Sequence, residues 1–245
     1  FGIVEEGRIV KSDEELTVMR HAARATEAGM EAGIAAAAPG VYENEVAAEI
    51  CAAMFKVGGE YPAVLPYVTS GPRTLVGHAT WEGRRIERDE IVFLEVGGCF
   101  RRYHTAMMRT VFTGEPPKAV RTAAGIVQEA RAHLLDAIRP GMTAGEIDQL
   151  NHNIINDNKL GGYLITRAGY SIGIAFPPSW DEGYILSLKS GENTPMQKGM
   201  TLHLLPWIYG VEGQYLVGMS ETIQVTEDGC ESFFSKPPAE LVTRS

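Results

Sequence analysis

Residues 36–46 read AAAPGVYENEV and residues 137–147 read AIRPGMTAGEI, so the chain carries one motif twice. Each motif follows a stretch, over residues 13–38 and 118–138, with apolar residues at spacings of three, four and seven. That period places the apolar side chains on one buried helical face. Proline and glycine end each helix, since neither continues one well, and a second helix opens at 42–45 and at 143–146. The repeat therefore predicts two helix–turn–helix units of like design.

Strand patterns follow each predicted pair of helices. They cover residues 64–70, 91–97 and 103–112 in the first half, and 201–208 and 218–226 in the second. Helix, helix and strands given twice predict an α+β fold whose halves, about 12–117 and 118–245, are related by a pseudo-twofold axis. An accidental repeat of two helices is the alternative.

The composition fits one globular unit. A chain of 245 residues with 44% apolar content can bury a substantial core. The net charge of −9, without a basic stripe, argues against a nucleic-acid partner. Cys51, Cys99 and Cys230 lack metal-ligand spacing and fit the reduced thiols of a cytoplasmic protein. The sequence has no apolar run of about 18 residues and no signal peptide, so no membrane span or anchor is predicted.

Five further stretches carry candidate chemistry. They read SGPRTLVGH at 70–78, IVFLEVGGCFRRYHTAMMRTVF at 91–112, AGYSIGIAF at 168–176, GMTLHLLPWIYG at 199–210 and MSETIQVT at 219–226. Together they resemble the creatinase, aminopeptidase P and methionine aminopeptidase family over nearly the whole chain. The resemblance implies the "pita-bread" fold, in which two helix–helix–strand halves surround a central, curved antiparallel sheet and the site lies between the halves.

The resemblance also implies where metal would bind. Metallopeptidases of the family hold two divalent ions on two Asp, one His and two Glu, which correspond here to Glu95, Ala106, Tyr170, Leu205 and Glu221. Alanine, leucine and a phenol are poor ligands for a hard dication, which prefers carboxylate, imidazole or water. We therefore expect no metal and no cofactor, and a family member that works without metal or does not work at all.

Two acids remain at these positions, Glu95 and Glu221. Two buried carboxylates close together cannot both stay ionised cheaply, so a proton or a cation must join them. We expect them to face one another and to hold a guanidinium or amidinium substrate. The alternative is that both are solvated or salt-bridged strand residues. His78, which ends the SGPRTLVGH loop, is the candidate general acid and base, because an imidazole exchanges protons near neutral pH. Glu95 is the other candidate base.

Four more residues are candidate substrate contacts. Tyr170 can donate a hydrogen bond from the Gly-rich turn, or it can be a packed aromatic. His203 and His104 stand two residues before Leu205 and Ala106, so a regular strand turns each toward the same face as that position. Trp180, in the FPPSWDEG segment, is expected to form a rigid lip that stacks on a flat cation.

The stretches around residues 101–104, 169–180 and 199–207 are most similar to the ectoine hydrolase branch of the family. This resemblance implies a metal-independent hydrolase of a small cationic C–N substrate, an amidine or guanidino compound. The alternatives are a hydrolase of creatine or an Xaa-Pro dipeptide, and an inactive binding protein of the same fold. The resemblance also implies a homodimer and an N-terminal domain, absent from this sequence, that closes over the site. Without it, we expect an open pocket, with Tyr170 and Trp180 more exposed than in a full-length protein.

Overall fold

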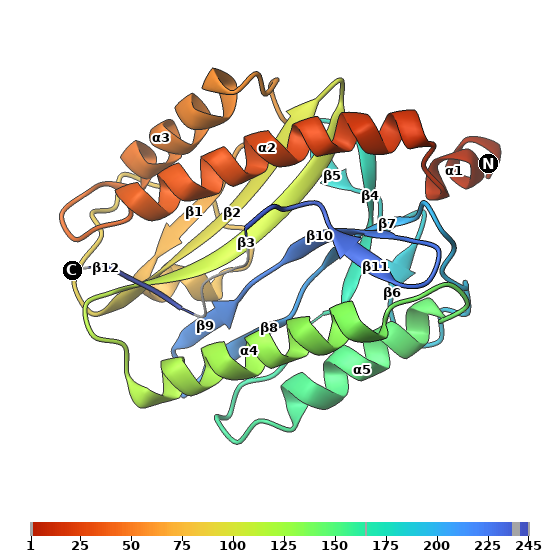
Figure 1. The fold of residues 1–245 in the computed structure, drawn as a ribbon. Coiled ribbons are helices and arrows are strands. Elements are labelled where there is room, and N and C mark those ends of the chain that lie inside the picture. The colour runs from red at the N-terminus through yellow and green to blue at the C-terminus, as the bar shows by residue number, and fades with distance from the viewer. Residues whose placement is uncertain (1, 165, 237–240, 245) are drawn as a thin grey trace.

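The structure, a computed structural model, describes residues 2–164, 166–236 and 241–244. Figure 1 shows one helix pair on each side of the strands. The first pair is α2 (Asp13–Ala36) and α3 (Glu43–Lys56), and the second is α4 (Lys118–Ala137) and α5 (Ala144–Asn156). A short helix, α1 (Ile3–Ile9), precedes them. Gly40 and Gly141 adopt φ of 94° and 90°, so each predicted Pro-Gly pair makes the left-handed turn that glycine favours. The predicted two-helix repeat is confirmed.

The strands of both halves join in one sheet. Its order is β1 (Tyr67–Ser70), β2 (Glu90–Phe100), β3 (Tyr103–Thr113), β4 (Gly169–Phe176), β7 (Thr201–Leu204), β10 (Glu221–Val225) and β11 (Cys230–Ser232). Neighbours in this order run antiparallel. The short strands β5 (Ser179–Asp181) and β6 (Ser187–Leu188) pair with β4, and β12 (Val242–Arg244) pairs with β3. The halves meet where Tyr103 of β3 pairs with Ile174 of β4.

Two predicted strands of the second half are each broken in the middle. The stretch 201–208 divides into β7 and β8 (Trp207–Val211), because Pro206 has no N–H for a ladder bond. The stretch 218–226 divides at residues 219–220 into β9 (Tyr215–Gly218) and β10. The freed segments, β8 and β9, form a separate hairpin. The breaks thus carry the chain out of the main sheet beside the family's fourth and fifth ligand positions.

Gly97 and Gly98 serve close packing rather than an irregular backbone. The β2–β3 ladder runs through both, pairing Gly97 with Ala106 and Gly98 with Thr105, so the strand is regular there. A Cβ added at Gly98 would lie 2.5 Å from the backbone nitrogen of Thr26 in α2. The missing side chain of Gly98 lets α2 lie directly on the sheet. Within the described residues, no helix has the length and apolarity needed to cross a membrane.

Candidate functional site

The five family ligand positions come from four strands and one strand end. Glu95 lies on β2, Ala106 on β3, Tyr170 on β4 and Glu221 on β10, while Leu205 directly follows β7. The ladders bring them together, since Ala106 pairs with Gly97, and Glu221 pairs with Leu204. The ligand positions therefore belong to the main sheet and lie on both sides of the β3–β4 junction.

His78 and Glu95 form the contact on which the site depends. The His78 Nε2 atom lies 3.3 Å from Oε2 of Glu95, whose side chain is 3% exposed, whereas the imidazole is 62% exposed. The Tyr67 ring lies 4.9 Å from the imidazole, centroid to centroid. The hydrogen bond and charge of Glu95 raise the pKa of His78 above 6.5, although burial opposes this. The pair thus joins a solvent-facing imidazole to a buried carboxylate.

A buried hydrogen-bonded chain lies at the Tyr170 position. The Tyr170 hydroxyl accepts a 3.0 Å bond from Nε1 of Trp180 and shares a 2.9 Å bond with Nδ1 of His203. The Nε2 atom of His203 lies 2.6 Å from Oγ of Ser220. Burial raises the pKa of Tyr170 well above its usual value and lowers the pKa of His203 to about 4, so both are neutral at pH 7.

His203 lies against Tyr170, its partner in the β4–β7 ladder. It is fully buried. Sequence reasoning missed Ser220, although this residue stands directly before Glu221.

Trp180 and Tyr170 are both buried. Trp180 is 3% exposed and Tyr170 is 6% exposed. The indole packs on Gly97, where an added Cβ would lie 2.6 Å from the ring. The predicted stacking lip at Trp180 is therefore wrong, because glycine on β2 leaves a slot that the indole fills. Trp180 instead orients the Tyr170 hydroxyl.

Glu221 already has cationic partners within the chain. Its Oε2 atom lies 2.7 Å from Nε of Arg131 and 3.8 Å from Arg109, and its Oε1 atom accepts from the Ser232 hydroxyl. Glu221 is 1% exposed. The expectation that it faces Glu95 and grips a substrate cation is therefore wrong, and the salt-bridged alternative holds. The signal for Arg109 was an arginine inside an apolar strand, whereas Arg131 gave none.

His104 is also inaccessible to a substrate. It is fully buried, its Nε2 atom accepts a 2.9 Å bond from the backbone N–H of Ala63, and burial lowers its pKa to about 4. The expectation that it lines the pocket is wrong, because residues 61–63 cover this end of β3.

The residues at the ligand positions do not fit a pair of divalent ions. Ala106 and Leu205 offer no donor atom, the Tyr170 phenol is neutral and bonded, and Glu221 is held by two guanidinium groups. Over residues 2–164, 166–236 and 241–244, no three His, Cys, Asp or Glu side chains are grouped to hold a metal. No catalytic step can be assigned to a metal here.

The comparisons with known proteins indicate one family for this chain. The model of metallopeptidase family M24 matches residues 17–227. The chain is 33% identical to an uncharacterized hydrolase/peptidase of Sinorhizobium fredii, 31% to an ectoine hydrolase of Halomonas elongata and 29% to an Xaa-Pro dipeptidase of Pyrococcus furiosus. These matches cover 97%, 94% and 94% of this chain and 60%, 59% and 64% of those proteins. The chain thus spans about three fifths of the length of these curated relatives.

Solved structures agree. A prolidase from Pyrococcus furiosus matches with a TM-score of 0.88 at 28% identity, covering 96% of this chain and 68% of that one. An Xaa-Pro dipeptidase from Bacillus anthracis matches with a TM-score of 0.89 at 28% identity, covering 99% and 66%. These likenesses confirm the predicted pita-bread fold.

Proposed function

Because the chain belongs to metallopeptidase family M24, we propose that it is a metal-independent hydrolase that cleaves a C–N bond of a small cationic substrate. The observation that carries this proposal is the 3.3 Å contact between His78 and Glu95, beside ligand positions that do not fit a metal. An amidine such as ectoine is the favoured substrate. This choice is supported by the 31% identity to an ectoine hydrolase over 94% of the chain.

His78 supplies the proton transfers in the proposed reaction. Its neutral imidazole takes a proton from a water molecule while the water oxygen bonds to the amidine carbon. The C–N bond then breaks, and the imidazolium returns the proton to the departing nitrogen. Glu95 stabilises the imidazolium between these steps, as its effect on the pKa of His78 indicates. General acid–base help of this kind contributes about 10²–10⁴ in rate.

Glu95 also explains why the substrate would be a cation. Within the described part of the chain, no arginine or lysine is paired with Glu95, in contrast to Glu221. When His78 is neutral, Glu95 is therefore a buried carboxylate without a positive neighbour in ion-pair contact, and such a group favours a cation. One acid, and not the expected two, would hold the amidinium.

Hydrolysis of an Xaa-Pro dipeptide is the second candidate. The similarity to Xaa-Pro dipeptidases, at 28–29% identity, favours it. The side chains at the ligand positions argue against this candidate, because the family's metallopeptidases use five metal ligands and two of those positions here are aliphatic.

Turnover by chelator-treated protein tests the proposal. We would assay ectoine, creatine and an Xaa-Pro dipeptide with wild type, His78→Ala and the control His133→Ala, which changes an exposed histidine on α4. We expect turnover of an amidine or guanidino substrate, lost by about 10²–10⁴ in His78→Ala and kept in the control. Dipeptide turnover that needs added metal would support the second candidate. Ligand binding without any turnover would instead make the protein a binding module.

A further inference from the structure

The turn that carries His78 is held in an unfavourable backbone conformation. His78 adopts φ of 58°, in the left-handed region that residues with a Cβ seldom occupy. Such a conformation persists only where the surrounding structure fixes it. The turn follows the 3-10 helix η1 (Gly71–Leu75), and both lie between β1 and residue 82. Contacts with the rest of the structure must therefore hold the segment 70–82 in this conformation.

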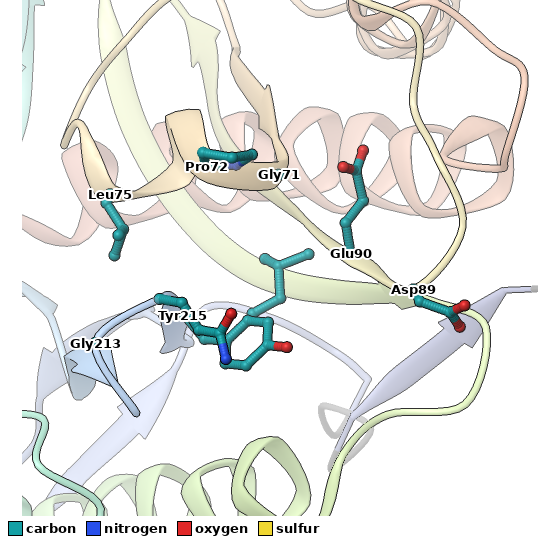
Figure 2. A pocket seen from close by; sticks show the side chains of 9 residues that line it. Gly71, Pro72, Leu75, Asp89, Glu90, Gly213 and Tyr215 are labelled. Carbon is teal, nitrogen blue, oxygen red and sulfur yellow. The ribbon is translucent and has the colours of Figure 1, made fainter.

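Packing beneath the segment is incomplete. A cavity of about 370 Å³ separates η1 from the β8–β9 hairpin. Figure 2 shows Pro72 and Leu75 of η1 on one side of this cavity and Tyr215 of β9 on the other. One hydrogen bond crosses to the hairpin side, from the Tyr209 hydroxyl to the Leu75 carbonyl oxygen, at 2.8 Å. Because side chains do not fill this space, packing against the hairpin supports η1 only in part.

A single buried carboxylate holds the opposite side. Glu43, at the start of α3, is fully buried and accepts four hydrogen bonds from the segment. Its Oε1 atom accepts from the backbone N–H of Ser70 at 2.7 Å and from the Ser70 hydroxyl at 2.8 Å. Its Oε2 atom accepts from Arg73 at 2.7 Å and from the backbone N–H of Glu82 at 3.0 Å. Glu43 thus joins both ends of the segment.

Arg73 extends this contact toward the histidine. One nitrogen of its guanidinium binds Glu43, and another donates a 2.6 Å bond to the carbonyl oxygen of Thr80, two residues beyond His78. We propose that Glu43, acting through Arg73, is a positioning residue that fixes the His78 turn against Glu95. Charged hydrogen bonds at the start, middle and end of the segment give it one conformation. This inference rests on the proposed function for the role of His78, but not for the geometry.

Titration of His78 by NMR tests the inference without any substrate. The variant Glu43→Gln keeps the shape but removes the charge that holds Arg73. With the turn released, contact with Glu95 weakens and the pKa of His78 should fall toward 6.5. Glu82→Gln is the matched control, because Glu82 also pairs with Arg73, at 3.3 Å, but its side chain is 68% exposed. It should leave the titration unchanged. Ile147→Ala, in the core of the second half, controls for lost stability alone and should also leave it unchanged.

Activity gives a second readout. On a turned-over substrate, Glu43→Gln should lower kcat by about 10- to 100-fold and change KM little, since misplacing a catalytic group costs rate. If Glu43→Gln does not fold, Arg73→Lys carries the same test, because an ammonium cannot bridge Glu43 and Thr80 as the forked guanidinium does. An unchanged titration of His78 in a folded variant of either residue would overturn the inference. If the pKa of His78 falls in these variants but wild type turns over no substrate, the positioning role of Glu43 is supported and the proposed function is refuted.

Discussion

Replacing Glu221 with Gln removes one charge from a buried cluster of three ionised groups. The Glu221 side chain is 1% exposed, that of Arg109 7% and that of Arg131 16%. Removing one partner of such a cluster costs about 3–5 kcal/mol, because a buried charge is left uncompensated. The amide oxygen introduced by Glu221→Gln would still accept the bond from Ser232, so we expect the lower end, about 3 kcal/mol. Burial already lowers the pKa of Arg109 to about 10 against the pull of Glu221.

Equilibrium unfolding in urea measures this cost. Wild type, Glu221→Gln, Arg131→Gln and the double variant form a cycle whose coupling free energy should be about 1.5–3 kcal/mol. Glu231→Gln is the control, since it breaks a pair with Arg20 in which both side chains are 49% exposed, and it should cost below about 1 kcal/mol. A cost below about 1 kcal/mol for Glu221→Gln, together with weakened amidinium binding, would refute the reasoning and return Glu221 to the substrate.

The geometry of the site supports three more predictions. The acid limb of kcat/KM should lie above pH 6.5, because Glu95 raises the pKa of His78 and the base must be neutral; Glu95→Gln should move that limb to lower pH in a pH–rate profile. Burial lowers the pKa of His203 from 6.5 to about 4. The free energy of unfolding should therefore decrease as the pH falls from 6.5 toward 4, because the unfolded state binds a proton that the folded state does not. At 1.36 kcal/mol per pKa unit, the loss is about 3 kcal/mol. Urea unfolding should show this loss in wild type and a smaller one in His203→Gln. Gly97→Ala places a methyl group 2.6 Å from the Trp180 ring, so the melting temperature and tryptophan emission should both change; unchanged values would contradict the packing.

The parts of the fold that local chemistry determines were predictable from sequence. The Pro-Gly pairs end helices wherever they occur, so the repeat marked both helix pairs within a few residues. The division of the stretch 201–208 was readable too, since Pro206 cannot donate to a ladder. The spacing of two residues likewise brought His203 to the face of the ligand positions, where it meets Tyr170.

The partners of the site residues were not predictable, because they come from distant parts of the chain. Arg131 lies on α4, 90 residues before the acid that it neutralises, and a helical arginine is ordinarily exposed. Trp180 is buried because two strands bring it onto Gly97, which the polar FPPSWDEG segment does not reveal. A sequence shows which residues can do chemistry, whereas tertiary contacts decide which of them are already occupied.

Metal dependence of activity tests the central proposal most directly. On one preparation, metal content by elemental analysis and turnover of the best substrate would be measured before chelation, after it, and after adding zinc, manganese or cobalt. The contact of His78 with Glu95, beside the aliphatic Ala106 and Leu205, predicts well below one metal per chain and the same kcat throughout. Stoichiometric metal, with activity that disappears on chelation and returns with the ion, would contradict it.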